Sequence, residues 1–230
     1  RFKAGGGTLY DLEYLVDETG RRVAAFGYWA GYAGAAVTLR CWMAQQNGGI
    51  AGTVGVFKSS DALVDDLHNA LNGLDKSTLN ALIIGALGRV GTGATDLLST
   101  LDIPVTKWDM AETASGGPFP EVLDHTLFLN CILARPGTPV FVPESAKTDE
   151  RQLSVIGDIA CDPDSDFSPI KVYNRTTTWD EPALRVHDAH PLDVTAIDNL
   201  PGLVAALQAD RLTSDALPTF TGTAPEAATV

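Results

Sequence analysis

The sequence has few cysteines and few histidines. Its three cysteines, Cys41, Cys131 and Cys161, are far apart and form no C-x-x-C pair. A disulfide framework and a zinc site both need closely patterned ligands, so the sequence argues against both and favours a reducing, cytoplasmic setting. The histidines show no metal-ligand spacing and are interpreted as surface or structural residues: His68, His125, His187 and His190. We therefore predict no metal site.

Basic residues are also scarce. The chain has 16 lysines and arginines against 29 acidic residues, which gives a net charge of −13. Nucleic-acid binding requires clustered positive charge, so this balance argues against a nucleic-acid partner and against an anionic membrane surface. No apolar run approaches the roughly 20 residues that cross a bilayer, so we predict no membrane segment.

The overall composition is that of a globular protein with a hydrophobic core. Of its 230 residues, 45% are hydrophobic and 20% are charged, which is typical of soluble folds. This length is enough for one large domain or one and a half ordinary ones. Because the first residue is Arg1 and not methionine, we expect the chain to be a piece of a longer protein.

Three glycines mark the most informative segment. Gly85, Gly88 and Gly91 follow an apolar predicted strand at 81–85 and open a predicted helix at 91–100. In an open α/β sheet such a turn presents the backbone amides of the helix start to the pyrophosphate of a dinucleotide. The spacing is G-x-x-G-x-x-G and not G-x-G-x-x-G, so an ordinary strand-to-helix turn is the alternative interpretation.

An acidic residue follows the next predicted strand. Asp109 comes directly after the strand at 104–108, and it lies about 20 residues beyond the glycines, as in dinucleotide-binding folds. A carboxylate at this place accepts hydrogen bonds from the adenosine ribose and repels the extra phosphate of NADP, so the predicted cofactor is NAD. For Asp109 alone, a solvated strand end is the alternative.

The rest of the chain alternates predicted strands and helices. The segment at 126–132 is a nearly continuous apolar run, typical of a parallel strand covered on both faces, and a further strand is predicted at 153–159. We therefore predict an α/β fold with a doubly wound, Rossmann-like parallel sheet. Two helices precede it: one at 27–46, rich in small residues and interpreted as buried against another backbone, and one at 61–72 with Ser60 as its N-cap.

The two ends of the chain read differently from this middle part. Residues 8–15 and 21–26 read as the two strands of a hairpin around a turn at 17–20. Residues 192–200 are strand-like and precede a predicted helix at 202–209. After residue 217 the chain is rich in Thr, Ala and Pro, and we predict disorder there.

Charged residues at two places are candidates for ligand contacts. Arg21 and Arg22 are adjacent on a predicted strand and so point to opposite faces. One could then bind a cofactor phosphate while the other clamps a substrate carboxylate; a solvated pair is the alternative. Asp162 follows the strand at 153–159, at the edge where such sheets bind ligands, although an ordinary strand-end acid would look the same.

Several short segments, spread over almost the whole chain, are specific when they occur together. The tyrosine-rich and double-arginine segments at 7–15 and 20–27 are the most distinctive. The others lie at 30–35, 85–91, 107–113, 116–119, 130–132 and 198–201. Together they resemble the NAD-dependent, lysine-forming saccharopine dehydrogenases.

The resemblance implies a two-domain enzyme with a cleft between Rossmann-like halves. It implies oxidative deamination of the small-molecule substrate saccharopine to lysine and 2-oxoglutarate, a step of lysine biosynthesis by the aminoadipate route, with NAD as cofactor. On this reading, residues 1–27 are a remnant hairpin of the N-terminal substrate domain and 28–200 form the NAD-binding domain. Residues 201–230 are a C-terminal helix returning to the other domain and a tail. We expect a monomer.

The resemblance also assigns individual residues. The implied cofactor contacts are Arg21, Gly88, Arg89, Asp109, Thr113, Asp198, Asn199 and Leu200, which join Gly85 and Gly91 of the glycine turn. The implied substrate contacts are Arg22, Phe26, Ala160, Cys161 and Asp162. The family's catalytic lysine and histidine belong to an N-terminal segment that this chain lacks, so we predict no catalytic residue here and no activity of the chain alone.

Two positions depart from the family. Val90 stands where a fungal relative has a cysteine that could pair with the one matching Cys131, and Ala160-Cys161 replaces a Ser-Ala pair. The second departure leaves room for a relative that acts on another N-substituted amino acid. A nucleotide-binding module without chemistry is the alternative of a different class.

Overall fold

The computed structural model describes residues 5–6, 15–20 and 22–204. Its centre is a six-stranded sheet in the order β2-β1-β3-β4-β6-β5. The strands are β1 (Ala81–Ile84), β2 (Val105–Trp108), β3 (Leu127–Asn130), β4 (Val155–Asp158), β5 (Leu184–His187) and β6 (Leu192–Thr195). All neighbouring pairs are parallel except β5 with β6. The predicted α/β parallel sheet is confirmed.

The strands lie where the apolar runs predicted them, but they are shorter. The runs at 126–132 and 153–159 become β3 and β4, and the segment at 192–200 is a strand only over β6. The antiparallel edge strand β5 was not predicted. Its four residues are all half-buried, because an edge strand has a neighbour on one side only, so it lacks the continuous apolar run of the central strands.

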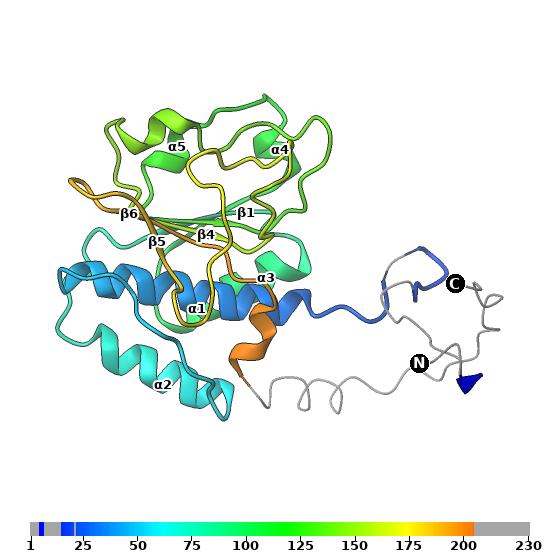
Figure 1. Cartoon of the computed structure of the whole chain (residues 1–230), viewed down its shortest axis with the longest axis horizontal. Helices are drawn as coiled ribbons and strands as arrows, with labels where there is room; N and C mark the ends of the chain where they lie inside the picture. Colours follow the sequence, from blue (N-terminus) through cyan, green and yellow to red (C-terminus); the bar gives the residue numbers. More distant parts are fainter. Residues whose placement is uncertain (1–4, 7–14, 21, 205–230) are drawn as a thin grey trace.

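Helices cover both faces of the sheet (Figure 1). On one face lie α1 (Gly27–Gln46), α2 (Ser60–Leu71) and α3 (Arg89–Thr100). The other face carries shorter elements: α4 (Met110–Thr113), α5 (Pro120–Leu123) and the 3-10 helix η3 (Glu144–Lys147). A last 3-10 turn, η4 (Leu200–Leu203), packs back on α1.

Alternating side chains of the strands contribute to two separate apolar cores, one on each face of the sheet. Ala81 and Ile83 of β1 belong to the core under α1, α2 and α3. Leu82 and Ile84 belong to the core on the opposite face. This is the period-two alternation of a strand covered on both sides, and it explains why β1 reads as an uninterrupted apolar run.

The long helix α1 is buried, as its small residues predicted. A Cβ added to Gly31 would lie 1.8 Å from the carbonyl oxygen of Val90 in α3. A Cβ added to Gly93 of α3 would lie 1.9 Å from the carbonyl oxygen of Tyr28 in α1. The two helices therefore touch backbone to backbone, which only glycine permits at these two positions.

The ends of the chain are described in part. In the hairpin, Val16 and Arg22 form an antiparallel bridge, and the Gly20 N–H donates to the Asp17 carbonyl at 2.9 Å, which confirms the predicted turn. Most of the predicted strand at 8–15, Arg21, the helix after residue 204 and the tail lie outside the described residues.

Helix α2 begins one residue before the predicted start. Its N-cap is Ser59 and not Ser60, because the Ser59 hydroxyl accepts the Ala62 N–H at 3.1 Å. We expect Ser59→Ala to lower the free energy of unfolding by about 1 kcal/mol, the usual cost of a lost cap. Ser60→Ala, in the first turn, should change it by no more than about 0.5 kcal/mol. Urea unfolding of both variants measures the difference, and equal losses would contradict this cap assignment.

Candidate dinucleotide site

The glycine turn lies at the carboxyl end of β1. Gly85 has φ +86°, and a Cβ on it would lie 2.6 Å from the Ile132 side chain. A Cβ on Gly91 would lie 2.2 Å from the Gly85 carbonyl oxygen. Both glycines are therefore required by conformation or by space. Helix α3 begins at Arg89, two residues before the predicted start, with Gly88 as its N-cap.

This turn has the features that suit an anion. No side chain caps α3 at Gly88, and its first turn contains no acidic residue. The amides at a helix start without a side-chain cap are free to bind a phosphate. The turn also lies where the strand order changes direction, since β1 has β2 on one side and β3 on the other. Open α/β sheets bind their ligands at this switch point.

Asp109 reaches the glycine turn from the end of β2. Its Oδ2 accepts the N–H of Leu87, within the turn, at 3.0 Å, and its Oδ1 accepts the Met110 N–H at 2.9 Å. The Asp109 N–H in turn donates to Glu112 Oε2 at 2.7 Å. The hydroxyl of Thr113, another predicted contact, donates to the Asp109 carbonyl at 2.9 Å. Asp109 is thus fixed beside the turn, where it is also the N-cap of α4.

Arg89 connects the turn to the hairpin. Its Nη2 donates to the backbone carbonyl of Arg22 at 3.0 Å. This contact brings the double-arginine segment to the start of α3, although the two are far apart in the sequence. Phe26, the other predicted substrate contact in this segment, is 59% exposed. Its ring is therefore accessible from solvent.

The loops after β4 and β6 form a second group at the same sheet edge. The Cys161 Sγ donates to the carbonyl of Ala196 at 3.1 Å. Burial raises the pKa of Cys161 to about 12, with further contributions from the charges of Asp158, Asp198 and Asp162. The structure therefore brings the predicted substrate segment, Ala160 to Asp162, close to the predicted cofactor residue Asp198.

Asn199 and Leu200, two of the predicted cofactor residues after β6, differ in their exposure. Asn199 has a left-handed backbone with φ +60° and is exposed. Leu200 is only 4% exposed, and a Cβ on Gly34 would lie 3.2 Å from its side chain. Its side chain therefore belongs to the core under α1, which leaves its backbone for any contact with a cofactor.

Sequence reasoning missed three polar residues at this edge. Asn130, Asp158 and Tyr173 are buried, and Asn130 and Tyr173 each donate a hydrogen bond to Asp158. The available signal was a polar residue ending each of two apolar strands, Asn130 in β3 and Asp158 in β4. The register that places them side by side was not readable from the sequence.

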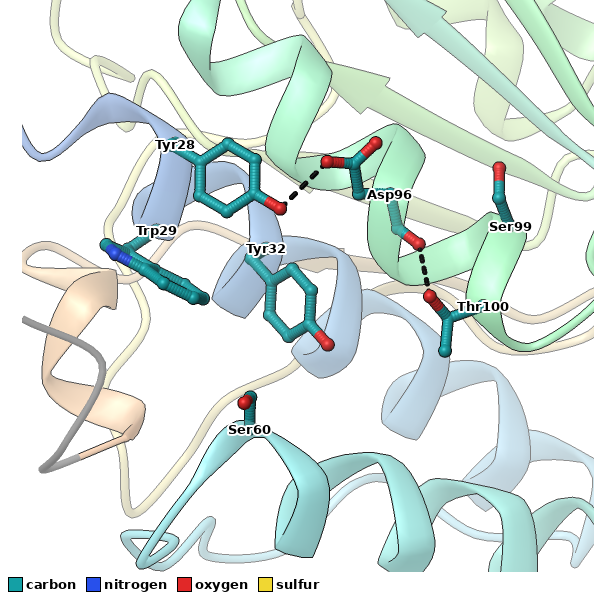
Figure 2. Close-up of a pocket in the computed structure, with 7 residues that line it drawn as sticks. All are labelled: Tyr28, Trp29, Tyr32, Ser60, Asp96, Ser99 and Thr100. Carbon is teal, nitrogen blue, oxygen red and sulfur yellow. Dashed lines mark hydrogen bonds between the residues drawn. The ribbon is translucent and has the colours of Figure 1, made fainter. Parts of the chain in front are cut away.

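A cavity of about 570 Å³ lies away from this edge, between α1, α3 and the start of α2 (Figure 2). Tyr28 donates from its hydroxyl to Asp96 Oδ2 at 2.8 Å across it. Burial, then the charges of Asp61 and Asp96, raises the pKa of Tyr32. None of the predicted site residues lines this cavity; its lining is Tyr28, Trp29, Tyr32, Ser60, Asp96, Ser99 and Thr100.

Within residues 5–6, 15–20 and 22–204, no group of three or more potential ligands is placed to hold a metal ion. Among the described helices, none combines the length and the apolar character needed to cross a bilayer.

The sheet order and the glycine turn define the class: an open, Rossmann-like α/β sheet with a glycine turn and Asp109 at its switch point. Within that class, the chain is similar over nearly its whole length to the NAD-dependent, lysine-forming saccharopine dehydrogenases of fungi, which confirms the resemblance. No family model matches the chain.

Three relatives show the extent of the similarity. The enzyme of Neurospora crassa is 43% identical, that of Candida albicans 40% and that of Schizosaccharomyces pombe 39%. Each match covers 96% of this chain. The chain spans 62% to 63% of the length of these relatives.

Proposed function

We propose that this chain is the NAD-binding part of a saccharopine dehydrogenase. The complete enzyme would oxidatively deaminate saccharopine to L-lysine and 2-oxoglutarate and reduce NAD. The observation that carries the cofactor assignment is the hydrogen bond from the Leu87 N–H to Asp109 Oδ2, which fixes a carboxylate against the glycine turn. The similarity to enzymes that are named for NAD and lysine supports the rest.

The residues at the sheet edge fit a dinucleotide. A side chain at Gly91 would fill the space of the turn, and the first turn of α3 contains no acid that would repel a pyrophosphate. Gly85, Gly88, Arg89 and Gly91 would hold the pyrophosphate, and Asp109 would accept from the ribose hydroxyls. Thr113 and residues 198–200 would line the remaining cofactor surface, together with Arg21.

The substrate would lie between this edge and the hairpin. Arg22 would clamp a carboxylate through its planar guanidinium, and Phe26 would cover the apolar part of the substrate. The segment Ala160 to Asp162 would face the reacting end, with Asp162 oriented toward a substrate amine. When bound, NAD supplies the hydride acceptor for the substrate carbon that carries the secondary amine.

The proposal extends to the organisation of the chain. Residues 1–27 would be a remnant of the substrate domain, 28–200 the cofactor domain, and 201–230 the return to the substrate domain and the tail. The acid–base pair would come from outside this chain, so the chain alone would be inactive. The complete enzyme would be a cytoplasmic monomer.

Titration calorimetry with NAD and NADP tests the cofactor assignment. We expect the chain to bind NAD and to bind NADP much more weakly, because Asp109 repels the extra phosphate. Asp109→Ala should weaken NAD binding by about 10- to 100-fold, since a charged hydrogen-bond acceptor is lost. Glu121→Ala removes an exposed acid on α5 and should leave binding unchanged. Equal binding of NAD by both variants would contradict the role of Asp109.

A completed enzyme tests the reaction. The part of the Neurospora crassa relative that the match does not cover can be joined to this chain. NADH formation from saccharopine in this hybrid is the expected result. A hybrid that binds NAD but oxidises only another N-substituted amino acid would replace the substrate assignment. A hybrid that binds NAD and oxidises none would favour a nucleotide-binding module without chemistry.

A further inference from the structure

Three buried polar side chains form a network at the ligand-binding edge of the sheet. Asp158 is 2% exposed, Asn130 is fully buried and Tyr173 is 7% exposed. The Tyr173 hydroxyl donates to Asp158 Oδ2 at 2.5 Å. The Asn130 side-chain amide donates to Asp158 Oδ1 at 2.9 Å. Both oxygens of one buried carboxylate are therefore held by neutral donors.

The network occupies the last row of the sheet before the loops. Asn130 of β3 is the register partner of Asp158 in β4, and also of Ile84 in β1. Ile84 is in turn the partner of Trp108 in β2. Each of these residues is the last of its strand. The carboxylate thus lies in the row directly below the loops that carry the proposed cofactor and substrate residues.

Asp158 also holds the loop that follows it. The backbone N–H groups of Ala160 and Cys161 lie close enough to its carboxylate to lower its pKa. Cys161 has φ +53°, a left-handed conformation that side chains rarely adopt. Such a conformation persists only where its surroundings fix it. Here the contact from the Cys161 Sγ to the Ala196 carbonyl holds the side chain, and the buried Asp158 carboxylate lies beside the backbone N–H of Cys161.

The charge of Asp158 has no cationic partner among the ion pairs of the described residues. Burial raises its pKa, and the hydrogen bonds from Tyr173, Asn130 and the two amides oppose that rise. A buried carboxylate without a counterion is costly in a folded protein. Asp193 of the neighbouring strand β6 is also fully buried, but it is paired with Arg185 and lies away from the ligand edge, near the amino end of its strand.

We propose that Asp158 is a positioning residue: held by Asn130 and Tyr173, it fixes residues 160–162 in the conformation that presents Asp162 to the substrate. Asp158 itself does not touch the substrate. The inference rests on the proposed function, because it takes this loop as the substrate loop.

Three variants test the proposal. Asp158→Asn keeps the shape but replaces one acceptor oxygen by an amide that donates. Tyr173→Phe removes one donor and leaves the charge of Asp158 in place, which keeps the test open if Asp158→Asn does not fold. Asp193→Asn changes a buried acid of the same sheet away from the ligand edge, and it is the matched control.

Alkylation of the Cys161 thiol in this chain reports on the loop without any catalysis. We expect the rate, followed by mass spectrometry of the peptide, to rise about fivefold or more in Asp158→Asn and Tyr173→Phe, because a loosened turn exposes the thiol. Asp158→Asn also removes a charge that raises the pKa of Cys161, so the rate in Tyr173→Phe, which keeps that charge, is the decisive one. Asp193→Asn should lower the melting temperature but leave the rate unchanged. A similar rate in all three variants would overturn the positioning role.

The hybrid enzyme gives the second measurement. Asp158→Asn and Tyr173→Phe should raise the KM for saccharopine about tenfold, because Asp162 is displaced, while NAD affinity stays within about twofold. Equal KM changes in Asp193→Asn would show a general loss of stability and would overturn the proposal. A parent hybrid without saccharopine oxidation would contradict the proposed function, while the alkylation rates would still decide whether Asp158 holds the turn.

Discussion

Replacing Gly91 by alanine is expected to weaken NAD binding by about 100-fold or more and to destabilise the fold. The new Cβ would lie 2.2 Å from the Gly85 carbonyl oxygen and 2.5 Å from the Ala86 Cα. Both are backbone atoms of the glycine turn, so no side-chain rotation can relieve the overlap. The turn must open or α3 must move, and either change displaces the amides that would bind the pyrophosphate. Titration calorimetry and thermal melting measure the two effects.

Gly88→Ala is the matched control within the same turn. A Cβ on Gly88 would meet only the Gly85 carbonyl oxygen, at 3.4 Å, and Gly88 has φ −77°, which alanine adopts freely. We expect its melting temperature to stay close to that of the parent chain. NAD binding should nevertheless weaken, because the added methyl group separates the backbone from the phosphate. Unchanged NAD binding in Gly88→Ala would show that the pyrophosphate does not lie over this residue.

The sequence predicted the central strands well because of how they are buried. β1, β3 and β4 are covered on both faces, so each begins as a short apolar run and ends at a glycine or a polar residue. The edge strand β5 is half-buried and carries Arg185 and His187. Its alternation is weak, and its pairing depends on β6, which is contributed by a later part of the chain.

The candidate site was predictable where its chemistry is local. The glycine turn depends on residues close together in the sequence, and Asp109 depends on the next strand of the same βαβ unit. The bond from Asp109 to Leu87 follows from this unit. The Asp158 network joins three segments whose proximity depends on strand register and on the path of the chain after β4. No spacing in a single sequence encodes those distances.

The N-cap of α2 was predicted one residue too late for a similar reason. Ser59 and Ser60 are both capable N-caps. Which serine accepts the amide depends on where the chain enters the helix, and the structure gives this role to Ser59. Likewise, the small residues of α1 predicted a close backbone neighbour but could not identify that neighbour as α3.

Because α3 packs backbone to backbone against α1, Gly31 of α1 is the position with the largest expected loss of stability. In Gly31→Ala the Cβ would lie 1.8 Å from the Val90 carbonyl oxygen and 2.9 Å from the Ala94 N. Both are backbone atoms of α3, so the overlap is relieved only if the helices separate or the local backbone shifts. We expect a loss of about 3 kcal/mol or more in the free energy of unfolding, and a melting temperature lower by about 10 °C. Gly52→Ala, with no atom within 4 Å of its Cβ, should show neither loss.

The double variant Gly31→Ala/Gly93→Ala distinguishes two ways in which the protein could respond. Gly93 makes the reciprocal contact, with its added Cβ 1.9 Å from the Tyr28 carbonyl oxygen. A single separation of the two helices would relieve both overlaps, so the double variant should lose less stability than the two single losses added together. Additive losses would instead mean that each site adjusts locally. Val90 lies in the first turn of α3, between Gly88 and Gly91 of the glycine turn. A separation of the helices should therefore also weaken NAD binding, whereas local adjustment at Gly93 should not.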